Sequence, residues 1–126
     1  MWAALPDLLA DVDADPQVRV LVVRGSGENF SAGADIRDFA GGLDEAAARA
    51  THERTERATA ALAALQTPSI AMVQGYCIGG GCALALCCDF RVASEGATFA
   101  ITPAKLGLVY SFTSTRRLVQ AVGSGY

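Results

Sequence analysis

The sequence lacks the features that send a chain into a membrane or out of the cell. Residues 1–12 have neither a basic start nor a continuous apolar run, so no secretory signal is predicted. The longest apolar stretch, residues 78–88, is interrupted by three glycines and is far shorter than the ~20 residues that span a bilayer. We therefore expect a soluble protein of the cytoplasm without a membrane partner.

Positive charge is also scarce. The chain has 10 Lys and Arg against 13 Asp and Glu, a formal net charge of -3. Such a balance gives no long-range attraction to nucleic acid or to anionic lipid, although a few local arginines can still hold a phosphate. No nucleic-acid partner is expected.

Cysteine is missing outside one short window, and histidine is almost missing. Cys77, Cys82, Cys87 and Cys88 lie within twelve positions, and the single histidine is His52. No cysteine lies elsewhere to pair with these four, so a disulfide framework is not predicted. The spacing C-x4-C-x4-C-C on a helix scatters the thiols around the axis, so a metal site is not predicted either. The cysteines are expected to be free, small, buried hydrophobic residues. His52 lies among charged residues and is expected to be solvated.

Apolar residues, by contrast, are abundant. They make up 52% of the sequence. The length of 126 residues is enough for one domain over residues 1–126 that buries roughly two-thirds of the surface of its unfolded chain. So high a fraction indicates either strands covered on both faces or an apolar surface for a partner. Oligomerisation is therefore expected.

The pattern of the chain predicts an α/β fold. Helices are predicted at 2–12, 43–66 and 113–123, and strands at 18–24, 69–74 and 90–94. Strand 18–24 is apolar at consecutive positions, so we expect both of its faces to be covered. Between the last two strands, "GYCIGGGCALALCCDF" gives a strand, a glycine turn and a helix. This strand–turn–helix–strand order is typical of α/β proteins.

The three glycines at 79–81 are the strongest chemical signal. Phosphate binding at a helix start is one interpretation, but GxxxxGK[ST] is absent and GxGxxG is out of register. The glycines also leave backbone N–H groups unhindered at a helix start, where the dipole favours a developing negative charge. That is half of an oxyanion hole. A second tight segment, "ENFSAGADI" at 28–36, follows a strand and is a candidate for the other half.

Together these segments resemble the crotonase superfamily, the enoyl-CoA hydratase and isomerase group. The resemblance is carried by "FSAGADI", by "PSIAMVQGYCIGGGCALALCCDFRVAS" and by "ATFAITPAKLGLVYSFTSTRRLVQAVG". It covers essentially the whole chain but only the middle of the family's domain, so an N-terminal strand and hairpin and a C-terminal helical part are expected to be missing. The resemblance implies a spiral of ββα units, assembled as homotrimers or dimers of trimers.

The resemblance also implies a ligand and a site. The substrate is an acyl-CoA thioester, with coenzyme A as part of it and no permanently bound cofactor or metal. The backbone N–H groups of Ala34 and Gly80 would hold the thioester oxygen, and Arg37 would lie near a phosphate. The residues expected along the CoA pocket are Ala32, Asp35, Ile36, Arg37, Gly79, Pro103 and Leu106.

Two positions depart from the hydratases of this family. Hydratases carry glutamates where this chain has Ala83 and Pro103, and neither residue can transfer a proton. "TPAKLGLVY" instead resembles methylmalonyl-CoA decarboxylase-like members, in which a tyrosine follows as Tyr110 does here. Those members can have histidine where this chain has Ala34.

We therefore expect an enolate-forming acyl-CoA enzyme with decarboxylase-like lyase chemistry, in which Tyr110 is the proton donor. The alternative for Tyr110 is a structural hydroxyl on a backbone carbonyl. Alternatives for the protein are a hydratase or isomerase that uses another acid or base, and a non-catalytic acyl-CoA-binding subunit. Lys105 and the pair Arg116 and Arg117 are assigned no catalytic role.

Overall fold

The computed structural model describes residues 1–33, 45–107 and 109–125. Its helices are α1 (Leu5–Ala14), α2 (Glu45–Ala63), α3 (Gly80–Cys87), α4 (Phe112–Val122) and the 3₁₀ helix η2 (Pro103–Leu106). Its strands are β1 (Leu21–Arg24), β2 (Ser69–Val73), β3 (Tyr76–Ile78), β4 (Phe90–Ala93) and β5 (Thr98–Ala100).

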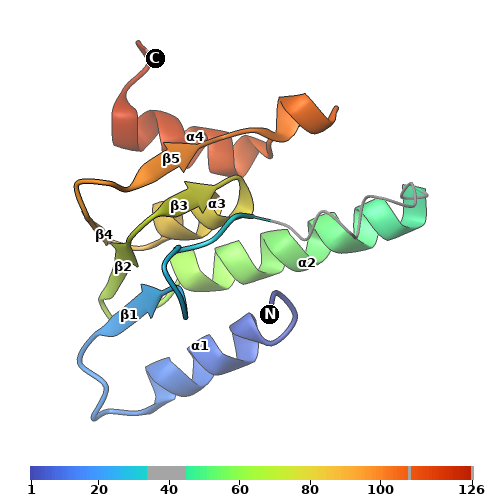
Figure 1. Ribbon diagram of the computed structural model, residues 1–126. Helices are drawn as coiled ribbons and strands as arrows, with labels where there is room; N and C mark the ends of the chain where they lie inside the picture. The colour runs from blue at the N-terminus through green and yellow to red at the C-terminus, as the bar shows by residue number, and fades with distance from the viewer. Residues whose placement is uncertain (34–44, 108, 126) are drawn as a thin grey trace.

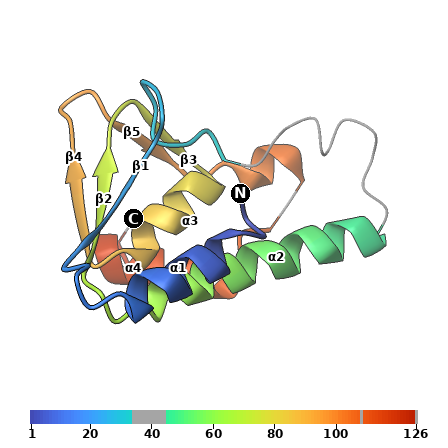
Figure 2. The ribbon, with the colours of Figure 1, turned by 90° about the horizontal axis from the view of Figure 1, so that it is seen from below.

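The strands form two parallel sheets, ordered β1-β2-β4 and β3-β5. The helices lie in a row in which α1 packs on α2, α2 on α3 and α3 on α4 (Figure 1). Figure 2 shows the three-stranded sheet standing to one side of this row. The α/β prediction is confirmed, and so is the order of strand, glycine turn, helix and strand. The helix and the turn connect the two sheets, because β3 belongs to one and β4 to the other.

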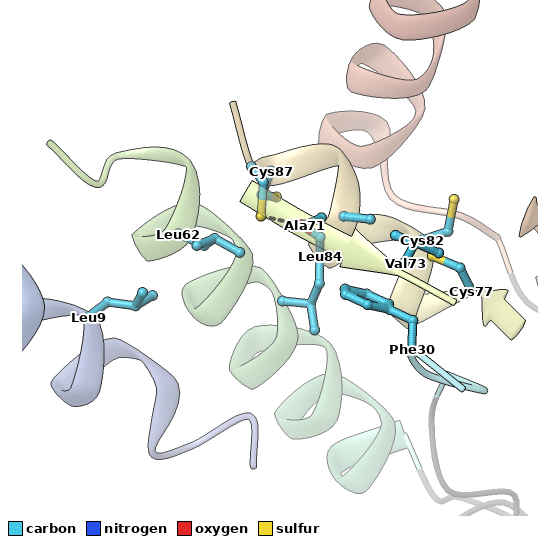
Figure 3. Close-up of a cluster of buried hydrophobic side chains, with 11 residues drawn as sticks. Leu9, Phe30, Leu62, Ala71, Val73, Cys77, Cys82, Leu84 and Cys87 are labelled. Carbon is cyan, nitrogen blue, oxygen red and sulfur yellow. Dashed lines mark hydrogen bonds between the residues drawn. The ribbon is translucent and has the colours of Figure 1, made fainter. Parts of the chain in front are cut away.

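The core lies between the three-stranded sheet and the helices (Figure 3). Leu9 from α1, Leu62 from α2 and Leu84 from α3 meet Ala71 and Val73 from β2 there, and each is at most 5% exposed. Helix α3 is buried on nearly all sides, because its residues are almost entirely small or apolar. The glycine turn is therefore carried by a helix that is buried along most of its length.

The outer face of the three-stranded sheet is exposed, contrary to expectation. Val22 in β1, Met72 in β2 and Val92 in β4 are 46%, 38% and 60% exposed, and β1 alternates between half-buried and exposed positions. The prediction that strand 18–24 is covered on both faces is wrong for this chain. An apolar run indicates that a strand can be buried on both faces. None of the described residues covers the outer face of this strand.

Local signals placed the ends of the last helix to within two residues. Ser111 caps α4, since its hydroxyl accepts a hydrogen bond from the Ser114 N–H at 3.2 Å. Gly123 ends the helix with a φ of +88°, a value that L side chains rarely adopt. Within the described ranges, no helix is both long enough and apolar enough to cross a membrane.

Candidate functional site

The glycine turn between β3 and α3 is shaped by its backbone. Gly79 has a φ of +53°, and a Cβ built on it would meet open space. Its N–H donates to the Ala100 carbonyl of β5 at 2.8 Å, and its carbonyl accepts from the Ala83 N–H at 3.0 Å. Gly80 is the first residue of α3, so its N–H has no acceptor within the helix. An N–H donor thus stands at the positive end of α3, on a turn fixed from both sides.

Residues 31–33 run directly beside this turn. The Ser31 N–H donates to the Tyr76 carbonyl, and the Ile78 N–H donates to the Ser31 carbonyl, both at 2.9 Å. Gly33 has a φ of +98°, and a Cβ on it would lie 3.0 Å from the Ile78 oxygen and 3.4 Å from the Gly80 nitrogen. Two segments nearly fifty residues apart therefore converge at the Gly80 N–H. The chain could not approach this closely with a larger residue at position 33.

Ser31 and Asn29 hold the two segments together, and sequence reasoning did not single out either one. The Ser31 hydroxyl accepts from the Gly33 N–H at 3.2 Å. A Cβ on Gly81 would lie 2.6 Å from the Ser31 Cβ and 2.8 Å from its carbonyl oxygen. The Asn29 side chain accepts from the Tyr76 N–H at 2.8 Å. The only available signal was the tendency of Asn and Ser to bond to nearby backbone, which does not identify the partner strand.

Tyr110 reaches the same turn from the loop before α4. Its hydroxyl donates to the Gly79 carbonyl over 3.4 Å, which is long for such a bond. The ring is half-buried, and burial raises the pKa of the phenol above its usual value of 10. Tyr110 is therefore a neutral hydrogen-bond donor at physiological pH. The contact fits the structural alternative for this hydroxyl, and it also places the phenol beside the turn.

The remaining predicted site residues are distributed as follows. Ala32 is exposed and adjoins Gly33, Ala83 is buried within α3, and Pro103 begins η2 three residues after Ala100. Leu106 ends η2. The predicted residues that lie outside the described ones are Ala34, Asp35, Ile36 and Arg37. The structure thus brings Ala32, Gly79, Gly80 and Tyr110 to one turn.

The cysteines behave as predicted, because all four are free and buried. A hydrogen bond with Cys82, together with burial, raises the pKa of Cys77. Burial raises the pKa of Cys87 and of Cys88 to about 11, so both are neutral thiols at pH 7. No group of histidine, cysteine and carboxylate side chains within the described residues could hold a metal ion. His52 is exposed, as expected.

Comparison with known proteins identifies relatives of this chain. The family model described as enoyl-CoA hydratase/isomerase matches residues 1–125. Crotonyl-CoA hydratase of Syntrophomonas wolfei is 39% identical over 122 residues, covering 96% of this chain and 46% of the relative. The 2,3-dehydroadipyl-CoA hydratase of Escherichia coli is 36% identical over 124 residues, covering 96% and 48%.

Solved structures show the same likeness. An enoyl-CoA hydratase/isomerase family protein from Hyphomonas neptunium superposes with a TM-score of 0.94 at 46% identity, covering 99% of this chain and 48% of that one. For enoyl-CoA hydratase from Bacillus anthracis the TM-score is 0.90 at 31% identity, with 98% and 48% covered. The chain spans about half the length of the relatives that it matches.

Proposed function

The chain belongs to the enoyl-CoA hydratase/isomerase family, and from that premise we propose that the protein binds an acyl-CoA thioester and stabilises its enolate through backbone N–H groups. The two donors are Gly80 and Ala34. One observation carries the proposal: a Cβ on Gly33 would lie 3.4 Å from the Gly80 nitrogen. Gly33 itself therefore lies beside the first donor.

The chemistry needs donors where charge develops. When a thioester becomes an enolate, negative charge moves onto its oxygen, and N–H groups already aimed at that oxygen need no reorganisation. Each such donor is worth about 3–4 kcal/mol of transition-state stabilisation, and the positive end of α3 adds to it. Neither donor uses side-chain chemistry, so alanine and glycine suffice.

The lyase reaction is favoured by the residues at two positions. The family resemblance implies glutamates in the hydratases where this chain has Ala83 and Pro103, and neither of these residues can remove a proton or orient water. Decarboxylation of a malonyl-type thioester needs no base: the bond to the carboxylate breaks, carbon dioxide leaves, and the electron pair enters the thioester as an enolate. A donor then protonates the α-carbon. Tyr110, a neutral phenol at the turn, is the proposed donor.

The names of the relatives favour a second candidate. Proteins similar to this chain are called crotonyl-CoA hydratase and 2,3-dehydroadipyl-CoA hydratase. Hydration of an enoyl-CoA through the same oxyanion site would require an acid or base from another position, because Ala83 and Pro103 cannot transfer a proton. The two candidates share the oxyanion donors and differ in the proton-transferring group.

The rest of the proposed site concerns the CoA portion. Ala32 and Gly79 border the turn, and the other proposed CoA-contacting residues are Asp35, Ile36, Arg37, Pro103 and Leu106. Coenzyme A enters as part of the substrate, without a permanently bound cofactor. The exposed apolar face of the three-stranded sheet supports assembly, proposed as a homotrimer or a dimer of trimers.

A turnover screen tests these alternatives. The purified protein is incubated with malonyl-type and enoyl-CoA thioesters, and loss of carbon dioxide and hydration are measured separately. Decarboxylation without hydration is expected. Hydration alone would establish the second candidate, and binding of thioesters with no turnover would leave a non-catalytic acyl-CoA-binding subunit.

A further inference from the structure

A pocket lies at the other end of α3, away from the glycine turn. It has a volume of about 190 Å³ and is lined by Leu86, Cys88, Arg91, Arg117, Gln120 and Ala121. These residues come from the end of α3, from β4 and from α4. Whole drug-sized ligands occupy pockets of roughly 300–1,000 Å³. This pocket is therefore suited to one small group.

Arg91 is fixed in this pocket by the end of α3. Its Nη1 donates to the Cys88 carbonyl at 2.8 Å and to the Ala85 carbonyl at 3.3 Å. Carbonyl oxygens orient a guanidinium and carry no net charge to neutralise it. Its planar fork has five N–H donors, so the Nη1 contacts leave donors for a ligand.

Arg117 contributes an unsatisfied donor. Its Nη1 is buried and has no hydrogen-bond partner among the described residues. Buried polar atoms of native proteins almost always have a partner, and an exception points to a ligand or water that completes the site. Because a guanidinium is a cation, the missing partner is best supplied by an anion.

The carboxylates near this pocket are engaged elsewhere or do not line it. The charge of Arg91 contributes to lowering the pKa of Asp89. The Oδ2 of Asp89, however, accepts hydrogen bonds from both the backbone N–H and the hydroxyl of Ser69 at 2.8 Å. The charge of Glu56 raises the pKa of Cys87, and the charge of Arg117 lowers it. Glu56 is nevertheless not among the residues that line the pocket. Within the described part of the chain, neither Arg91 nor Arg117 has an ion-pair partner.

We propose that this pocket is a binding site for a small oxyanion, a phosphate or carboxylate group, held between Arg91 and Arg117. Guanidinium donors match the oxygen spacing of both groups and bind them by charge-assisted hydrogen bonds. Gln120 adds an amide at the rim. The site is separated from the Gly80 turn by the length of α3 and does not depend on the proposed function.

Calorimetric titration of the protein with inorganic phosphate, and separately with acetate, at constant ionic strength tests this site. We expect saturable one-to-one binding of at least one of the two anions. Arg117→Gln should weaken it about tenfold or more, the scale of one lost charge-assisted hydrogen bond. Arg116→Gln is the matched control, since it removes the same charge from an exposed neighbour on α4. It should leave the affinity within about twofold.

Circular dichroism and thermal melts establish that each variant is folded. If Arg117→Gln does not fold, Arg117→Lys replaces it, because lysine keeps the charge and loses the planar fork; it should weaken binding severalfold. Absence of saturable binding of either anion to the wild type overturns the proposal. So does an equal loss in the Arg116 and Arg117 variants. Loss of self-association in Arg117→Gln without any anion binding also overturns it, because an acidic side chain of a second copy would then fill the pocket.

Discussion

The two ends of α3 are built by opposite means. At its start, Gly79, Gly80 and Gly81 present backbone groups, and Gly81 packs so tightly on Ser31 that it has no room for a Cβ. At its end, the long side chains of Arg91 and Arg117 surround a pocket. The first end depends on glycines, which have no side chain, and the second end depends on the charged side chains of two arginines. Substitutions should therefore change shape or donor count at the first end and charge at the second.

The largest effect is expected from Gly80→Pro. Proline is favoured at the first position of a helix, so α3 should still form, but the N–H that the proposed mechanism needs is gone. Removal of one oxyanion donor lowers turnover by about 10²–10³-fold. Steady-state kinetics on the substrate found in the screen measure this, with a thermal melt to show that the fold is kept. Turnover within tenfold of wild type would mean that this N–H is not a catalytic donor.

Tyr110→Phe tests the side chain at the same end. Phenylalanine keeps the ring and removes only the hydroxyl, so kcat should fall by roughly 10²-fold while KM and the melting temperature barely change. The opposite pattern is a loss of about 1 kcal/mol in unfolding free energy with near-normal kcat. That pattern would mean that the hydroxyl has only a structural role, as a hydrogen-bond donor to the Gly79 carbonyl.

Gly81→Ala tests how tightly the first end is packed. A methyl group would lie 2.6 Å from the Ser31 Cβ and 2.8 Å from its carbonyl oxygen, so backbone must move, and we expect a loss of about 1–3 kcal/mol in denaturant unfolding. Gly96→Ala is the matched control, since a Cβ there meets nothing within 4 Å; it should change stability by less than about 0.5 kcal/mol. Equal effects of the two substitutions would show that the close approach to Ser31 is not rigid.

The smallest effect concerns Asp89, which follows the second end of α3. The N–H and hydroxyl of Ser69, with a smaller contribution from Arg91, lower the pKa of this carboxyl below 3.8. Because the folded pKa lies below the unfolded value, its contribution to stability is present above about pH 4 and is lost as the pH falls through the folded pKa. The melting temperature of Asp89→Asn should therefore lie below wild type at pH 7 and approach it as the pH falls from about 4 through the folded pKa. Asp11→Asn on α1 is the control, and a gap independent of pH would refute the assignment.

Local signals in the sequence predicted the helices well. Apolar spacing identified α1, and the Ser/Thr start and Gly123 marked α4 to within two residues. Strand β5 was missed because it is only three residues long and exists through pairing with β3, a partner some twenty residues away. The burial of the outer face of the three-stranded sheet was wrongly predicted. An apolar run shows that a strand can be buried on both faces, but it does not show which elements pack on those faces.

The candidate site was predictable to a similar depth. The glycine run and the family resemblance pointed to Gly80, whereas Ser31 and Asn29 could be recognised only once residues 29–33 were seen against 74–81. Arg116 and Arg117 look alike in sequence, as two helix charges. The fold separates them by exposing the first and burying the Nη1 of the second.

A crystal structure of the protein with a bound acyl-CoA thioester, or a stable analogue of one, tests the central claim most directly. We expect the thioester oxygen to lie about 2.7–3.1 Å from the backbone nitrogens of both Gly80 and Ala34, at the start of α3. A ligand whose carbonyl oxygen lies beyond hydrogen-bond distance of the Gly80 nitrogen, or two N–H groups that do not converge on one point, would contradict it.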